Sequence, residues 1–294
     1  VEGAPALVDI DGDQDLEIIF TTTTGSGGQV YVIHHNGATE SGFPKEIGSM
    51  FAGPAVHDLD NDGVVDVVCV TYDKEIYVIE AIGGAIKSGF PFTAESRFSM
   101  PATIVDVDSD GDYEIAAGCN SGDLYVLHHD GVIHSQYDTG DDIRGGISVC
   151  DLNNDGQLDL LFGGYDDRIH VWDPMAGELL PGWPVDLGYN SLSEPVIADL
   201  DGDGQVEVLA ARKTGKIFAY ESDGTLMGNF PIPVEGSIES SPAIEDIDGD
   251  GDLELIIGTT AGLEVIDVKY DAELMDSWSM YRGTMYRAGV YDAS

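Results

Sequence analysis

Short apolar runs separated by polar turns recur along the whole chain, in the same order each time. An apolar segment leads into an acidic stretch, a second apolar run follows, and a third comes after a polar or glycine-containing turn. Residues 52–81 contain AGPAVHDL, VVDVVCVT and EIYVIEA in this order. The runs are four to eight residues long, rich in β-branched and aromatic residues, and bounded by Gly, Pro, Asn or Asp. This pattern predicts β-strands, and no amphipathic stretch of helical length interrupts it.

A Gly-aromatic-Pro element closes four of these units, at residues 41–44, 88–91, 181–184 and 228–231. The third unit has IHSQYDTG in its place and the last has DSWSMY. Four short strands in each unit of this length are typical of a propeller blade. A blade cannot bury both faces by itself, so neighbouring blades have to stack.

The acidic stretch sets the period of the repeat. It begins six times, at Asp9, Asp58, Asp106, Asp151, Asp199 and Asp246, with steps of 49, 48, 45, 48 and 47 residues. The sequence therefore predicts an all-β, six-bladed β-propeller with four antiparallel strands per blade. We expect one domain over residues 1–294, with blades at about 1–47, 48–95, 96–142, 143–188, 189–236 and 237–294. The tail, residues 277–291, is expected to supply the outer strand of the sixth blade.

Each acidic stretch reads as a metal-binding loop between the first and second strands. Numbered from its first Asp, the loop has carboxylates at positions 1, 3, 5 and 9 and usually Gly at position 6, which permits a turn with positive φ. Position 7 would offer its backbone carbonyl. Like charges this close repel by roughly 4 kcal/mol at about 4 Å, so a cation is expected among them. Six or seven hard oxygen ligands suit Ca²⁺ better than Mg²⁺, and no Cys or His stands at a ligand position, which disfavours zinc and copper.

The candidate calcium ligands are positions 1, 3, 5, 7 and 9 of the six loops. They are Asp9, Asp11, Asp13, Asp15 and Glu17; Asp58, Asp60, Asp62, Val64 and Asp66; Asp106, Asp108, Asp110, Asp112 and Glu114; Asp151, Asn153, Asp155, Gln157 and Asp159; Asp199, Asp201, Asp203, Gln205 and Glu207; and Asp246, Asp248, Asp250, Asp252 and Glu254. Up to six structural calcium ions are expected. The first and fourth loops should bind most weakly, because Gln14 stands where Gly is usual and Asn153 replaces a carboxylate.

Two alternatives compete with this interpretation of the loops. An EF-hand needs a bidentate Glu at position 12 and helices on both sides, whereas position 12 here is Phe, Cys, Ala or Ile within a strand pattern. A solvated acidic turn without metal is a real alternative for one loop, but six loops in register, each with an acid at position 9, disfavour it.

With these residues in view, the chain resembles the FG-GAP/VCBS repeats of integrin α-subunit-like propellers. The DxDxDGxxD/E loop recurring about every 48 residues carries the resemblance over nearly the whole chain. The resemblance implies calcium in the loops on one face and partners bound on the opposite face. It does not specify an activity, and the chain differs from the integrin arrangement in blade number and in lacking an inserted adhesion domain.

Composition adds a strongly acidic surface. The formal net charge is −43, and 32 acidic residues remain against 12 basic ones after the 23 loop carboxylates are set aside. Nucleic-acid and anionic-membrane binding are therefore disfavoured, and no signal-peptide pattern or transmembrane run occurs in these residues. The three cysteines, Cys69, Cys119 and Cys150, lie in apolar strands and are expected to be buried free thiols. Millimolar calcium points to an extracellular or cell-surface protein.

The loops opposite the calcium loops are candidates for a ligand face. They carry Phe51, Tyr72, Arg97, Phe98, Arg144, Tyr165, Arg168, Tyr189 and Arg212. Exposed aromatics with arginines suit a protein or glycan ligand, although such residues also plug a channel or pack between blades. No catalytic motif appears, and the histidine pairs 34–35 and 128–129 are interpreted as turn residues.

Three functions follow from these observations. The first is a calcium-stabilised, non-enzymatic module for adhesion, recognition or surface assembly. The second is a structural repeat module of a larger cell-surface or filament protein. The third is a polysaccharide-degrading enzyme similar to propeller-type rhamnogalacturonan lyases, which the shortage of Lys and Arg disfavours.

Overall fold

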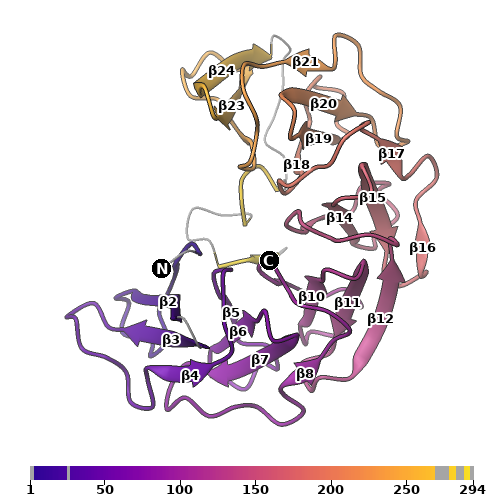
Figure 1. Ribbon diagram of the computed structural model, residues 1–294. Coiled ribbons are helices and arrows are strands. Elements are labelled where there is room, and N and C mark those ends of the chain that lie inside the picture. The colour runs from indigo at the N-terminus through magenta and orange to yellow at the C-terminus, as the bar shows by residue number, and fades with distance from the viewer. Residues whose placement is uncertain (1–2, 25–26, 269–277, 283–287, 292–294) are drawn as a thin grey trace. The chain divides into compact units, whose positions relative to one another are not determined.

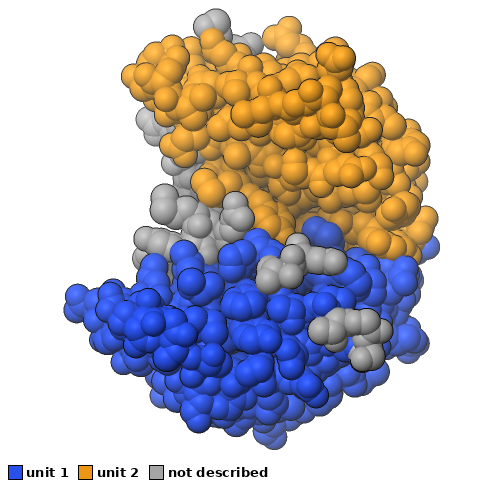
Figure 2. Space-filling view, turned by 60° about the vertical axis from the view of Figure 1, so that its left-hand side comes forward, with its two compact units in different colours: residues 1–140, 285–292, 294 blue, residues 141–284, 293 orange. Residues whose placement is uncertain are grey.

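The computed structural model describes residues 3–24, 27–268, 278–282 and 288–291, and over these residues the chain forms strands and no helix (Figure 1). No helix of sufficient length and hydropathy to span a bilayer occurs in this part of the chain. The prediction of an all-β fold is confirmed. Figure 2 colours two compact units, residues 1–140 with 285–292 and 294, and residues 141–284 with 293. Each unit is described by itself, and the assignment of the chain to one domain stays a prediction.

The first unit contains three sheets. Its strands are β1 (Ala6–Val8), β2 (Glu17–Thr24), β3 (Gly27–Ile33), β4 (Lys45–Ile47), β5 (Ala55–His57), β6 (Asp66–Val70), β7 (Glu75–Glu80), β8 (Phe92–Thr93), β9 (Thr103–Val105), β10 (Glu114–Gly118), β11 (Asp123–Leu127), β12 (Ile133–Asp138) and β25 (Val290–Tyr291). The orders are β1-β2-β3-β4, β5-β6-β7-β8 and β12-β11-β10-β9-β25. All pairs are antiparallel except β25 with β9.

The second unit repeats this plan. Its strands are β13 (Ser148–Cys150), β14 (Asp159–Gly163), β15 (Arg168–Asp173), β16 (Glu178–Leu179), β17 (Val185–Asp186), β18 (Val196–Ala198), β19 (Glu207–Arg212), β20 (Lys216–Tyr220), β21 (Ile232–Pro233), β22 (Ala243–Glu245), β23 (Leu253–Thr259) and β24 (Gly262–Val268). The orders are β13-β14-β15-β16, with β17 also pairing β15, then β18-β19-β20-β21 and β22-β23-β24. The predicted four-stranded antiparallel repeat is thus present, with three strands of the sixth sheet among the described residues.

The hydrophobic cores lie between neighbouring sheets, and strand alternation explains why. Successive side chains of a strand point to opposite faces. In β6, Val67 and Cys69 belong to the core shared with the first sheet, whereas Val68 and Val70 belong to the core shared with the third. A sheet covered on both faces needs a continuous apolar run, as DVVCV provides. Each fully buried side chain of this size contributes roughly 1.5–3 kcal/mol. The three cysteines are buried free thiols, as predicted.

In three of the four Gly-aromatic-Pro elements, the glycine packs against the next sheet of the same unit. Gly42 lies against the turn at Gly83, Gly89 against Asp130 and Gly182 against Asp223. A Cβ on Gly89 would lie only 1.8 Å from the Asp130 carbonyl oxygen, and Gly89 has φ 91°. Only glycine therefore permits this approach of the two backbones. The third repeat lacks the element, and the boundary between the two units follows it.

The expectation that the tail forms the outer strand of the sixth sheet is wrong for its described part. In the second unit the carbonyls of Trp278 and Ser279 accept hydrogen bonds from the first strands β18 and β22, at Ile197 N and Ile244 N. In the first unit β25 pairs in parallel with the first strand β9. First strands are sheet edges with unpaired N–H groups, and the tail satisfies some of them. Residues 269–277, 283–287 and 292–294 lie outside the described residues.

Candidate metal centres

The nine-residue acidic loop connects the first and second strands in all six sheets. In the second sheet it runs from Asp58, directly after β5, to Asp66, the first residue of β6. Because these two strands pair antiparallel, the loop is a closed turn at one end of the sheet. Position 9 lies at the start of the second strand, where its side-chain direction is fixed by the ladder.

Two positions of every loop have positive φ. Position 6 has φ between 74° and 97°, and Gln14 adopts this conformation at 74°, as predicted for the departure in the first loop. Position 4 also has positive φ in every loop, which sequence reasoning missed. Its residues are Gly12, Asn61, Ser109, Asn154, Gly202 and Gly249. Small or Asn-type residues at this position were the available signal, because Gly and Asn tolerate the left-handed region best.

Backbone N–H groups orient the loop carboxylates in the same way six times. In the second loop Asp58 Oδ2 accepts from Gly63 N at 2.8 Å and Asp62 Oδ1 accepts from Val64 N at 2.8 Å. The equivalent bonds, from position 6 to position 1 and from position 7 to position 5, occur in the other five loops. In the first three loops, one carboxylate oxygen from each of positions 1, 3 and 5 lies within 4.8 Å of the others.

The position 9 carboxylate is buried in every loop. Glu17, Asp66, Glu114, Asp159, Glu207 and Glu254 are at most 5% exposed, and each accepts a hydrogen bond from the backbone N–H of position 2. Burial raises the pKa of Asp66 to about 6, of Glu114 and Asp159 to about 7, and of Glu207 to about 8. A buried carboxylate is costly unless it is protonated or faces a positive charge, so each position 9 acid is a candidate cation ligand.

The donor set fits calcium. Asp66 Oδ1 and Asp60 Oδ1 of the second loop and Asp106 Oδ1 of the third are buried and accept no hydrogen bond from any described residue. Side chains at positions 1, 3, 5 and 9 and the carbonyl at position 7 would supply oxygen ligands only, which is the donor chemistry that Ca²⁺ prefers.

Comparison with known proteins gives the family. A model described as "FG-GAP-like repeat" matches residues 9–69, 151–210 and 199–257, which together make up more than half of the chain. The chain belongs to the FG-GAP-like repeat family. The resemblance inferred from the sequence is thereby confirmed. No curated protein matches the chain.

Solved structures similar to this FG-GAP-like chain show the fold. The V. cholerae biofilm matrix protein Bap1 has TM-score 0.64 at 22% identity over 83% of this chain, which spans only 42% of Bap1. Saccharomyces cerevisiae Sqt1 has TM-score 0.65 at 14% identity, covering 87% of this chain and 69% of Sqt1. The Neurospora crassa Pan2 WD40 domain has TM-score 0.52 at 12% identity, covering 87% and 73%. WD40 domains are β-propellers, so the FG-GAP-like chain has a propeller-like fold.

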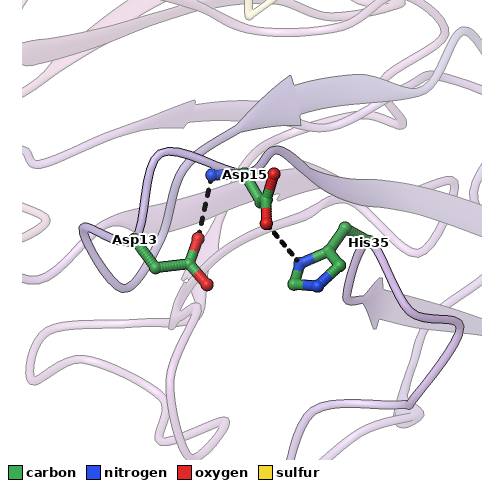
Figure 3. Close-up of side chains that lie close together, drawn as sticks. All are labelled: Asp13, Asp15 and His35. Carbon is green, nitrogen blue, oxygen red and sulfur yellow. Dashed lines mark hydrogen bonds and ion pairs between the residues drawn. The ribbon is translucent and has the colours of Figure 1, made fainter.

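Histidines after the third strand lie beside the loops of the first and third repeats. His34 Nδ1 is 3.3 Å from Glu17 Oε1, and His128 Nδ1 is 3.1 Å from Glu114 Oε1. His35 and His129 lie 3.5 Å from the position 7 carboxylates of the same repeats, and Figure 3 shows His35 with Asp15 and Asp13. The hydrogen bond with Glu40 is the main cause that raises the pKa of His34. Sequence reasoning placed these histidines in turns but did not bring them to the loops.

A lysine reaches the second loop. Lys87 Nζ is 2.8 Å from Asp60 Oδ2 and 2.9 Å from Asp66 Oδ2, the side chains of positions 3 and 9. Its side chain is 12% exposed. No sequence signal had connected Lys87, which precedes the second Gly-aromatic-Pro element, with the loop.

At the opposite end of the sheets, the ligand-face candidates form two separate groups. In the first unit Phe51 and Tyr72 have ring centroids 4.3 Å apart, and Arg97 lies 5.1 Å from the Tyr72 ring. In the second unit Arg144 lies 5.3 Å from the Tyr165 ring.

The remaining candidates are not grouped in this way. Arg212 contacts the Phe218 ring at 5.8 Å and donates to Leu187 O, while Arg168 and Tyr189 are exposed. The expectation that Phe98 belongs to the ligand face is wrong. Its side chain is 2% exposed, lies in the core between the second and third sheets, and offers no surface to a ligand. Phe98 forms an antiparallel β-bridge with Cys119, and its large side chain packs in this core.

Proposed function

We propose that this FG-GAP-like chain is a six-bladed β-propeller braced by calcium, acting as a non-enzymatic adhesion, recognition or surface-assembly module. The carrying observation is the six-fold recurrence of a buried position 9 carboxylate beside oriented carboxylates at positions 1 and 5. Calcium bound in a loop would neutralise these groups and link the first two strands of the sheet. Asn153 reduces the charge of the fourth loop, so this site is proposed as a weak one.

An extracellular or cell-surface location is part of the proposal. Extracellular calcium modules bind with dissociation constants of roughly 10⁻⁴–10⁻³ M, which only calcium-rich surroundings fill. The net charge of −43 supports a partner other than nucleic acid or an anionic membrane. The partner proposed is a protein or glycan at the end of the sheets opposite the loops, where Phe51, Tyr72 and Arg97 gather.

A structural role within a larger protein is a second candidate. The similarity to a biofilm matrix protein of which this chain spans 42% supports it. In that case the repeats would act as a rigid spacer and the chain would bind no soluble ligand. Binding of the purified domain to an array of immobilised oligosaccharides separates the two candidates. Turnover of pectic polymers would contradict the non-enzymatic proposal.

The deciding experiment is calorimetric unfolding in calcium and in excess chelator, with a metal count per chain by mass spectrometry. We expect about six calcium ions and a large fall in the unfolding temperature on chelation. A site filled at 100 times its dissociation constant stabilises the folded state by about 2.7 kcal/mol, so several sites rival the whole stability of an ordinary domain. An unchanged transition without bound metal would contradict the proposal.

A further inference from the structure

The second and fifth repeats present different residues to otherwise similar loops. Lys87 and Met227 each stand three residues before the aromatic residue of a Gly-aromatic-Pro element. Their backbone N–H groups donate to the third strands in the same way, Lys87 to Val78 O and Met227 to Ala219 O, both at 2.9 Å. The two residues therefore occupy equivalent positions, one with a charged end and one with an apolar end.

Lys87 directs its ammonium group into the second loop. Nζ bonds Oδ2 of Asp60 and of Asp66, while Oδ1 of each aspartate is buried and accepts no hydrogen bond from a described residue. The Asp66 side chain is fully buried, so this contact is screened much less than a surface ion pair. The loop thus holds one positive charge of its own among four carboxylates.

This charge acts in opposite directions on the two states of the loop. Without metal, the ammonium offsets repulsion among the carboxylates and holds two of them in place. With metal, calcium shares the same two carboxylates with a second cation, and like charges this close repel each other. We infer that Lys87 is a resident cation of the second loop, which keeps that loop ordered without calcium and weakens its calcium binding. This inference rests on the proposed calcium function.

Among the residues that the structure describes, no Lys or Arg forms an ion pair with a carboxylate of the fifth loop. Met227 is 8% exposed and lines a cavity of about 400 Å³ together with Leu200 and Asp201, which are positions 2 and 3 of the fifth loop. The methionine thioether offers no positive charge to the buried Glu207 of this loop. The cavity leaves room for a longer, charged side chain, so Met227→Lys can introduce an equivalent ammonium group beside the fifth loop.

Hydrogen exchange followed by mass spectrometry tests the inference on the full chain, through peptides that cover residues 58–66 and 199–207. Amides such as Gly63 N and Gly204 N bond to loop carboxylates and report the order of each loop. In the wild-type protein, chelation should speed exchange in the fifth loop at least about tenfold more than in the second. Lys87→Met should make the second loop as sensitive to chelator as the fifth. It should also lower the calcium dissociation constant of the second loop at least about tenfold, measured by calorimetric titration of the chelator-treated protein.

Two further variants keep the test decisive. Lys74→Met removes a lysine of the same sheet whose Nζ bonds Glu95 O, and it should leave the second loop unchanged. Met227→Lys should make the fifth loop resistant to chelator, which holds even if Lys87→Met folds poorly. The inference is overturned if chelation removes protection from the second wild-type loop as much as from the fifth. It is also overturned if neither Lys87→Met nor Met227→Lys changes the sensitivity of its loop to chelator. If no peptide responds to calcium in any variant, the proposed calcium function itself fails.

Discussion

The two ends of the sheets differ in how strictly they are repeated. At the loop end, backbone φ values, carboxylate hydrogen bonds and the buried acid recur in all six repeats. The third strand also returns to this end, as the bond from Ala81 N to Val65 O shows in the second sheet. At the opposite end each repeat carries different residues, including the Phe51–Tyr72–Arg97 group in the first unit. Repetition is expected where a feature stabilises every sheet, and variation where a surface serves recognition.

The largest effect of a single substitution is expected at the loop end, where neighbouring sheets meet. Gly89→Ala would place Cβ 1.8 Å from the Asp130 carbonyl oxygen at a residue with φ 91°. Overpacking and the left-handed conformation together should lower the free energy of unfolding by about 3 kcal/mol or more. Denaturant unfolding in saturating calcium measures this loss. Gly37→Ala is the control, since Gly37 has φ 84° with nothing within 4 Å, and should cost only about 1 kcal/mol. Equal losses would show that the contact between sheets is unimportant.

A substitution inside a loop should have an effect that depends on calcium. Glu207→Gln keeps the shape of the buried position 9 side chain but removes its charge. In calcium the variant should lose about 2–3 kcal/mol, the stabilisation that one filled site supplies. In chelator the loss should shrink to within about 1 kcal/mol, because no buried charge then needs a partner.

The control for this prediction is Glu178→Gln, an exposed glutamate of β16, which should behave as wild type in both conditions. Paired calorimetric scans with and without chelator give the four values required. A loss of the same size in both conditions would mean that Glu207 supports packing alone and binds no metal.

Much of the loop end could be predicted from sequence because its determinants are local. Strand alternation, the spacing of the carboxylates within a loop and the residue at position 6 are all set within about ten residues of one another. The contacts of Lys87 and His34 could not be predicted, because they depend on how far the third strand returns toward the loop. The prediction for the tail was also wrong. The tail bonds to unpaired N–H groups of the first strands, and these groups line up only once the sheets have formed.

The second unit holds a buried acid away from the loops, and it predicts a different pH response. Glu194 is fully buried, and its Oε1 accepts from Trp278 Nε1 and, at 2.9 Å, from Arg282 N. Burial raises its pKa to about 7 from 4.5. The folded state therefore binds the proton more tightly than the unfolded state does. The stability from this group is complete below about pH 4.5 and is lost as the pH rises to about 7, on the order of 3 kcal/mol in all.

Glu194→Gln keeps the acceptor and removes the titration. The difference in free energy of unfolding between variant and wild type should rise in favour of the variant from pH 4.5 to 7, measured by denaturant unfolding at constant saturating calcium. Loop carboxylates titrate equally in both proteins and cancel in this difference. A difference that does not change over this pH range would contradict the assignment.

The smallest effect on stability is expected at the variable end, where the effect on binding should be largest. Arg97→Ala removes an exposed guanidinium 5.1 Å from the Tyr72 ring, a contact that contributes about 0.5–1 kcal/mol. Binding to an array of immobilised oligosaccharides should fall at least about tenfold, because such arginines and aromatics provide most of the energy of an interface. Lys45→Ala, which removes an ammonium bonded to Gly84 O at the loop end, should leave binding unchanged. If Lys45→Ala weakens binding as much as Arg97→Ala, the ligand recognises overall charge, and the contrast between the two ends does not extend to recognition.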